Sequence, residues 1–174
     1  MTMFELSEEQ RSIQKSVHEF AEKELAPKAS FWDTQEEFPW ELVRKMAEMG
    51  LTGLRLPTGY GGTGADLITA GIALEEVARY DHNCAVILCG SNITGRVLLH
   101  GSDRIKRTYL PDIAKGGCIL AFAAMESEAG SDIRAIKTNA KRVKNSYVVN
   151  GEKSMITFAD VAQGFVVLVK TDGK

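Results

Sequence analysis

The spacing of apolar residues changes near Gly116-Gly117, and this change limits the folds open to the chain. Before that point apolar residues recur at helical spacing, as in Ile13, Val17, Phe20, Ala21 and Leu25. From Cys118 to Met125 the chain is an apolar run with the length of one buried strand. Helices followed by strands, without alternation, predict an α+β protein. We therefore expect a helical domain over residues 1–117 and a β domain over residues 118–174.

Capping residues mark the expected helix starts. Ser7 and Gln10 form a capping box, in which each side chain bonds the other residue's amide. Asp66, Asp81 and Ser102 each precede a further helical stretch as N-cap residues.

Prolines and glycines mark the expected helix ends. Pro27 is expected to end or break the first helix, and Pro111 to break or kink the last one before Ala114. Gly50 is a natural terminator for a helix over residues 41–49. The run 84–93 is apolar nearly all round, which predicts a helix at the centre of a bundle.

The β domain is expected to be incomplete. Asn150-Gly151 predicts a tight turn between strands at residues 146–149 and 152–157, and residues 164–169 predict a further strand. Three or four strands are too few to close a barrel or sandwich. The β domain is therefore expected to be part of an antiparallel barrel or sandwich.

The glycine-rich loop at residues 56–64 has two interpretations. Such loops can cradle phosphate, but this one lacks the Lys-Ser/Thr of a P-loop and fits no strand-glycine-helix fingerprint. A structural turn between helices is the better interpretation.

Composition excludes several classes of protein. A net charge of −2 in 174 residues does not favour nucleic acid as a partner. Three cysteines without a Cys-x-x-Cys pair predict neither a disulfide framework nor a zinc site, and no histidine stands at metal-ligand spacing. No apolar run reaches the roughly 18 residues of a membrane span. The acidic start of the chain is unlike a targeting peptide, so a cytoplasmic protein is expected.

The stretch at residues 121–132 is a strand that runs into a turn of small residues. It contains the residue types of this chain that are most suited to binding a ligand. It reads Ala-Phe-Ala-Ala-Met-Glu-Ser-Glu-Ala-Gly-Ser-Asp. Backbone amides, hydroxyls and carboxylates at a strand end can bind a polar ligand. Such residues are equally common in an ordinary loop.

This stretch resembles the aromatic-x-x-Thr-Glu-x-x-Ala-Gly-Ser-Asp segment of acyl-CoA dehydrogenases. Residues 136–140 (Ile-Lys-Thr-Asn-Ala) and 150–157 (Asn-Gly-Glu-Lys-Ser-Met-Ile-Thr) resemble two later motifs of that family. Residues 56–64, 74–79 and 109–116 are similar to its helical domain. The resemblance covers essentially the whole chain, with the motifs in the family's order.

The resemblance implies a helical domain, a middle β domain and a C-terminal four-helix domain that is absent from these residues. It implies FAD as cofactor and oxidation of an acyl-CoA thioester to a trans-2-enoyl-CoA, as in fatty acid metabolism. It also implies an electron-transfer flavoprotein as electron acceptor and a homo-oligomer, either a tetramer or a dimer.

The resemblance also assigns flavin-binding residues. Phe122, Ala124 and Met125 fall where the family touches the pyrimidine edge of the flavin, and Ser131 falls where a serine contacts both FAD and the CoA substrate. The tripeptide that flanks the flavin ring is Met155, Ile156 and Thr157, with Thr157 matching the hydroxyl near flavin N5.

Two of these residues depart from the family pattern. Met125 stands where threonine is usual, and Met155 where tryptophan or phenylalanine covers the ring. These changes either retune the flavin environment, weaken flavin binding, or are neutral at packing positions. A non-catalytic subunit without flavin is one alternative function. An acyl-CoA oxidase or flavin monooxygenase relative is another.

No residue of the chain matches the family's catalytic base, which usually belongs to the C-terminal domain. Glu126 and Glu128 lie beside the flavin segment, but Glu126 matches a position without a base role. We therefore expect no catalytic residue here, and no turnover by the 174 residues alone.

Overall fold

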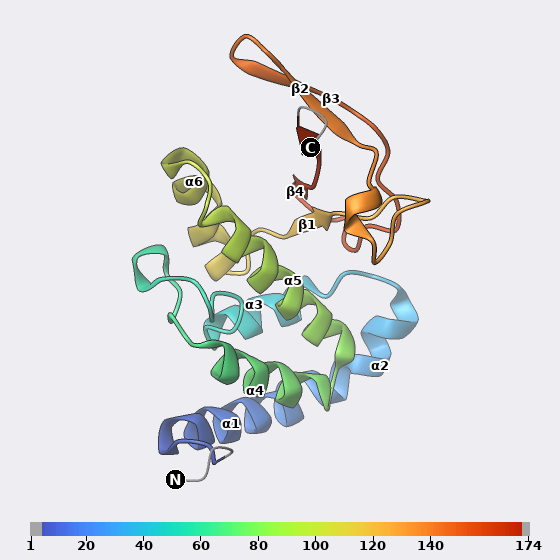
Figure 1. The fold of residues 1–174 in the computed structure, drawn as a ribbon. Helices are drawn as coiled ribbons and strands as arrows, with labels where there is room; N and C mark the ends of the chain where they lie inside the picture. The colour runs from blue at the N-terminus through green and yellow to red at the C-terminus, as the bar shows by residue number, and fades with distance from the viewer. Residues whose placement is uncertain (1–4, 172–174) are drawn as a thin grey trace. The chain divides into compact units, whose positions relative to one another are not determined.

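The computed structural model describes residues 5–171. These residues divide into two compact units, between Cys118 and Ile119. The first unit is helical and the second contains short strands (Figure 1). This arrangement confirms the α+β fold class.

The helical unit contains six α-helices, with one π-helical and one 3₁₀ segment, among the described residues. They are α1 (Glu8–Phe20), η1 (Ala21–Leu25), α2 (Ala26–Gln35), α3 (Trp40–Glu48), η2 (Thr58–Tyr60), α4 (Leu67–Ala78), α5 (His82–Leu98) and α6 (Asp103–Ala114). Helix α4 packs between α1 and α5, and α5 also contacts α6 (Figure 1). The largest fully buried side chains of this unit are Leu25, Leu42, Met46, Leu51, Leu56, Leu88, Leu110 and Ile113.

The expected helix caps are confirmed. The hydroxyl of Ser7 accepts a hydrogen bond from the Gln10 amide, and the Gln10 side chain accepts one from the Ser7 amide. The side chains of Asp66, Asp81 and Ser102 accept bonds from the third residue of α4, α5 and α6, respectively. Each cap satisfies an amide that has no partner inside its helix.

Pro27 does not end the first helical run, and Pro111 does not break α6. Pro27 stands in the first turn of α2, which follows α1 through the π-helical segment, and a missing amide is tolerated in a first turn. Pro111 lies inside α6, which nevertheless continues to Ala114. Leu110 and Ile113 are fully buried beside Pro111, so packing holds the last turn in place.

Helix α5 contacts α3, α4 and α6, but one of its sides is exposed among the described residues. Its buried side includes Ile87 and Leu88, but Val86, Ile93 and Val97 are each more than 40% exposed. The apolar residues on the open side of α5 therefore do not all contribute to the core of this unit.

The loop at residues 56–64 is a structural turn. Gly62 packs so closely that an added Cβ would lie 2.1 Å from the Leu56 carbonyl oxygen and 2.5 Å from that of Gly53. Gly61 adopts a φ of +84° after the 3₁₀ turn. The glycines of this loop are thus used for close packing and for chain reversal.

The second unit contains five short strands among the described residues. They are β1 (Leu120–Ala123), β2 (Asn139–Val143), β3 (Ser146–Asn150), β4 (Gly164–Val167) and β5 (Lys170–Thr171). Strands β1 and β4 are parallel, β2 and β3 are antiparallel, and β2 and β5 are parallel. Pairing within the described sheets is therefore mixed.

The expected turn at Asn150-Gly151 is wrong. The hairpin turns at Lys144 and Asn145, where Lys144 adopts the left-handed conformation with φ 54°. Residues 152–157 form no strand. A Cβ on Gly151 would lie 2.5 Å from the Thr138 hydroxyl oxygen, so this glycine permits close chain approach instead of a turn.

Candidate functional site

Two loops of the second unit lie side by side and contain the residues expected to bind flavin. One loop follows β1, and the other follows β3. The amide of Ser154 donates a hydrogen bond of 3.1 Å to the carbonyl oxygen of Met125. Met125 and Met155, which are 30 positions apart in the sequence, are thus brought close together by the main chain.

The carboxylate of Glu126 links these two loops through hydrogen bonds and an ion pair. It accepts hydrogen bonds from the Lys137 amide (2.6 Å), the Thr138 amide (3.0 Å) and the Thr138 hydroxyl (2.5 Å). The Lys153 ammonium lies 2.9 Å from the same carboxylate and also donates to the Ala124 carbonyl oxygen at 2.9 Å. The side chains of Lys153 and Glu126 are only 11% and 8% exposed.

This environment makes Glu126 a structural anion. Burial raises the pKa of its carboxyl, but hydrogen bonds from Thr138, Lys137 and Lys153 outweigh that effect and lower the pKa to about 2. A carboxylate with so low a pKa and so many donors is a poor proton acceptor. Glu126 therefore does not fit the role of general base.

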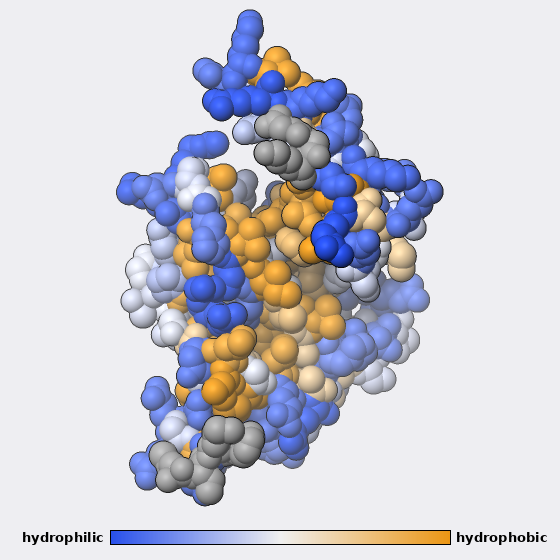
Figure 2. Space-filling view, in the orientation of Figure 1, coloured by the Kyte–Doolittle hydropathy of each residue, from blue (hydrophilic) through white to orange (hydrophobic). Residues whose placement is uncertain are grey.

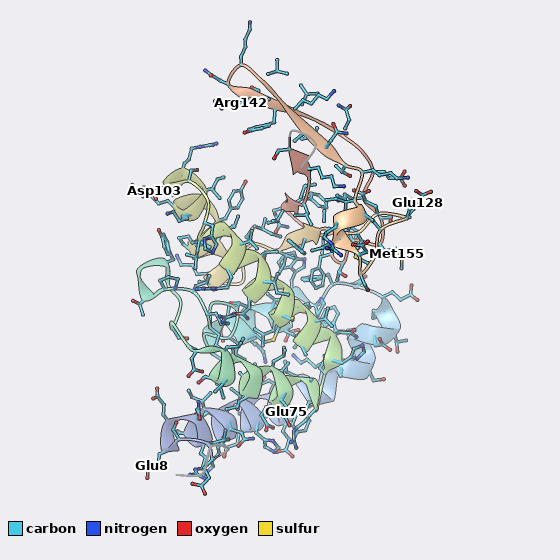
Figure 3. All side chains as sticks on the ribbon, viewed as in Figure 1. Glu8, Glu75, Asp103, Glu128, Arg142 and Met155 are labelled. Carbon is cyan, nitrogen blue, oxygen red and sulfur yellow. The ribbon has the colours of Figure 1, made fainter. Side chains whose placement is uncertain are left out.

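Glu128 is also unsuited to that role. Its exposed carboxylate pairs with Lys137, and a hydrogen bond from Lys137 lowers the pKa of Glu128. Figure 3 shows Glu128 and Met155 in neighbouring loops of this unit. The third carboxylate of residues 121–132, that of Asp132, accepts a hydrogen bond of 3.2 Å from the Arg134 amide.

Three of the candidate flavin residues are apolar and exposed. Phe122, Met125 and Met155 are 41%, 38% and 92% exposed, whereas Ala124 is buried. Met155 adopts a φ of 54°, an uncommon backbone conformation for a residue other than glycine. Such local strain is often retained at ligand sites.

Two of the candidate flavin residues carry exposed hydroxyl groups. Thr157 is exposed, and among residues 5–171 neither its hydroxyl nor its amide forms a hydrogen bond. Ser131 is also exposed, and Ile156 is half-buried. A main-chain hydrogen bond joins the loop of Met125 to the loop of Met155. Within the described chain, no hydrogen bond links Ser131 to Met125 or Met155.

Sequence reasoning missed Lys153 and Thr138, which complete the cluster around Glu126. The sequence contained one partial signal for this cluster, the position of Glu126 at the end of a buried strand. A buried carboxylate requires hydrogen-bond donors or a counter-charge nearby. Nothing in the spacing of residues 126, 138 and 153 shows that they meet. Their contact depends on how the β1–β2 and β3–β4 connections are folded.

The histidines and cysteines form no metal site. No group of three or more His, Cys, Asp or Glu residues suited to a metal occurs in the described part of the chain. Cys84 and Cys118 are buried, Cys89 is half-buried, and all three are free. Between Glu5 and Thr171, no helix is long and apolar enough to cross a membrane.

His18 has a structural role within the helical unit. Its Nδ1 lies 2.9 Å from the buried Glu76 carboxylate, and its Nε2 lies 3.0 Å from the Tyr80 hydroxyl. Burial raises the pKa of Glu76, but hydrogen bonds from His18 and Gln14 and the charge of Arg79 lower it below its ordinary value. The cluster joins α1 to α4.

Comparison with known proteins identifies the family. The acyl-CoA dehydrogenase N-terminal domain matches residues 7–117, and the middle domain of the same family matches residues 121–174. The chain belongs to the acyl-CoA dehydrogenase family.

The chain is similar to several bacterial members of this family. An acyl-CoA dehydrogenase of Bacillus subtilis is 34% identical over 95% of this chain and 44% of its own length. A 3-(aryl)acrylate reductase of Clostridium sporogenes is 38% identical over 95% of this chain and 45% of its own length. The chain therefore spans less than half the length of these relatives.

Solved structures show the same fold. The glutaryl-CoA dehydrogenase of Mycobacterium smegmatis in complex with FADH2 is 27% identical, with a TM-score of 0.90 over 96% of this chain and 44% of that chain. A structure of the electron transferring flavoprotein of Acidaminococcus fermentans contains a chain that is 34% identical, with a TM-score of 0.85 over 97% of this chain and 45% of that chain. FAD is the cofactor that these comparisons support.

The residues present fit a flavin. A flat, partly apolar ring requires an exposed apolar surface with polar groups at its edge. Phe122, Met125 and Met155 supply the surface, and Thr157 supplies a hydroxyl without a partner in the described chain. The Glu126 cluster holds the two loops that contain Met125, Met155 and Thr157.

Proposed function

We propose that the protein containing this chain catalyses FAD-dependent α,β-dehydrogenation of an acyl-CoA thioester to a trans-2-enoyl-CoA. The observation that carries this proposal is the hydrogen bond between Ser154 and Met125, which joins the two loops that resemble the family's flavin-binding motifs. The family membership of both units supports it.

The residues of the two loops are assigned to cofactor binding. Phe122, Ala124 and Met125 would hold one edge of FAD, and Met155 and Ile156 would flank the ring. When bound, FAD would supply the hydride acceptor. Thr157 would donate a hydrogen bond to the ring nitrogen where negative charge develops, which lowers the barrier to reduction. Ser131 would contact FAD and the CoA part of the substrate.

Proton removal requires a group outside the described residues. The α-carbon of a thioester loses its proton to a carboxylate held within hydrogen-bond reach. Glu126 is held as an anion by its donors, and Glu128 is exposed and paired with Lys137. We therefore propose that residues 1–174 alone do not turn over acyl-CoA.

The partners and the compartment are also proposed. Electrons would leave to an electron-transfer flavoprotein, and the similarity to a chain in the structure of such a flavoprotein supports this choice. We propose a cytoplasmic homo-oligomer, either a tetramer or a dimer.

The exposed Met155 favours a second candidate, a non-catalytic subunit without flavin. A flexible thioether that is 92% exposed covers a ring less well than an aromatic side chain. The visible spectrum of the purified complete protein separates the two functions. A flavin band supports the dehydrogenase, whereas a colourless protein that remains colourless with excess FAD supports the non-catalytic subunit.

A third candidate transfers electrons to oxygen, as an acyl-CoA oxidase or a flavin monooxygenase does. Reducing the protein with acyl-CoA without oxygen, and then admitting oxygen, tests this function. Slow reoxidation supports the dehydrogenase, and fast reoxidation supports the oxygen-dependent enzymes.

A further inference from the structure

A pocket of about 390 Å³ opens between α4 and α5 within the helical unit. Its lining is mainly apolar and includes Leu67, Leu74, Leu88, Ile93 and Val97. Figure 2 shows apolar surface gathered over these two helices. The size and lining are typical of a site for a small molecule with an apolar body.

Two arginines at this pocket have no anionic partner among the residues that the structure describes. Arg55 and Arg96 both line the pocket, and within residues 5–171 neither forms an ion pair. The Nε atom of Arg55 is buried and donates no hydrogen bond in the described chain. A buried donor without a partner is uncommon in folded proteins and requires an explanation.

The local structure fixes Arg55 at the pocket. Its amide donates to the Asn92 side chain at 3.2 Å, and Asn92 in turn donates to the Leu88 carbonyl oxygen at 2.8 Å. The neighbouring Leu56 packs so closely on α5 that a Cβ on Gly95 would lie 2.8 Å from it. The guanidinium is therefore attached to a well-packed segment.

We propose that this pocket binds a carboxylate with an apolar chain or ring, and that Arg55 recognises the carboxylate. An arginine remains charged and presents a planar fork of donors that matches a carboxylate. The apolar walls of α4 and α5 accommodate the body of the ligand and exclude water from the ion pair. The same end group occurs on free fatty or aryl carboxylates and at the distal end of a dicarboxylic acyl thioester. Of these ligands, the dicarboxylic acyl thioester rests on the proposed dehydrogenase function.

Gly71 offers a way to close the pocket without disturbing the fold. It lines the pocket from α4, and a Cβ built on it meets no atom within 4 Å. Gly71→Leu should therefore fill the pocket. Because leucine favours a helix more than glycine does, the change should raise the melting temperature by about 2–4 °C.

Titration calorimetry of the complete protein with octanoate and the neutral octanamide tests the proposal. We expect octanoate to bind at least tenfold more tightly than octanamide. Arg55→Met should weaken octanoate binding at least tenfold, and Gly71→Leu should abolish it. The exposed Arg107, on α6 and outside the pocket lining, provides the matched control, and Arg107→Met should leave the affinity unchanged.

Three results would overturn the proposal. They are equal affinity for octanoate and octanamide, no binding of octanoate, and unchanged octanoate affinity in an Arg55→Met protein that melts like the parent. The calorimetric result does not require a bound flavin. Failure of this proposal is therefore distinguishable from failure of the proposed dehydrogenase function.

Flavin reduction by two acyl-CoA substrates identifies the source of the carboxylate. If the thioester is the source, Arg55→Met should raise the KM for suberyl-CoA at least tenfold and leave that for octanoyl-CoA unchanged. If the calorimetric result holds but the suberyl-CoA KM does not change, the ligand is a free carboxylate. Both results support recognition of a carboxylate by Arg55.

Discussion

The ammonium of Lys153 and the carboxylate of Glu126 lie 2.9 Å apart, and both side chains are about nine-tenths buried. Lys153 belongs to one candidate flavin loop and Glu126 to the other. Together with the hydrogen bond from Ser154 to Met125, this pair fixes the distance between the two loops. A binding surface assembled from two loops requires this kind of support.

Glu126→Gln should weaken FAD binding at least tenfold. The substitution preserves the size of the side chain but leaves the buried Lys153 ammonium without its counter-charge. The two loops should then separate more readily. The dissociation constant of FAD, measured by flavin fluorescence, checks this expectation.

Glu128→Gln is the matched control, because it removes a carboxylate from the same loop but breaks only an exposed pair with Lys137. It should change FAD affinity by less than about twofold. Equal losses in the two variants would contradict the role given to Glu126.

FAD binding should weaken as the pH falls from about 4.5 towards about 2. The pKa of Glu126 in the folded protein is about 2, below its ordinary value of 4.5. A carboxyl whose folded pKa is depressed contributes stability above the unfolded pKa and loses it as the pH falls through the folded pKa. Flavin release followed by fluorescence should show this acid transition.

The Glu126→Gln protein provides the control for this acid transition. It should lack the component of flavin release that arises from Glu126. Identical acid profiles for the parent and the variant would show that another group controls flavin release.

Thr157→Val should slow flavin reduction by about tenfold or more, the usual effect of removing one donor from a developing charge. Valine keeps the shape of threonine and removes only the hydroxyl. Stopped-flow measurement of the flavin band after mixing with acyl-CoA gives the rate. Thr108→Val, on the exposed side of α6, is the control. Reduction at the parent rate in Thr157→Val would show that the hydroxyl is only structural.

His18→Ala should lower the free energy of unfolding of the helical unit by about 1–3 kcal/mol. The change removes one donor from the buried Glu76 carboxylate and the partner of Tyr80. Urea unfolding, followed by circular dichroism, measures the effect. The exposed His100 serves as control, and His100→Ala should change stability by less than about 0.5 kcal/mol. Equal stability of the two variants would contradict the structural role of His18.

Much of the helical unit was predictable, because its signals are local. Ser7, Asp66, Asp81 and Ser102 cap helices through bonds that span three residues. The effects of prolines were less predictable. Pro111 lies inside α6 because burial of its neighbours outweighs the lost hydrogen bond, and burial depends on the tertiary fold.

The second unit was harder to predict, because its contacts are not local. Asn150-Gly151 has the composition of a hairpin turn, but Gly151 is required for its close approach to Thr138. Lys144 takes the left-handed position in the turn that forms. The cluster of Glu126, Thr138 and Lys153 likewise joins residues whose spacing follows no repeating pattern. The candidate flavin residues were selected by resemblance to a family, and their proximity became visible only in the structure.

Anaerobic titration of the complete, FAD-loaded protein with a series of acyl-CoA thioesters tests the central claim most directly. We predict that at least one thioester bleaches the flavin band and yields one trans-2-enoyl-CoA per flavin, as measured by mass spectrometry. A protein that binds no FAD, or whose bound flavin is not reduced by any acyl-CoA, would contradict the proposed dehydrogenase function.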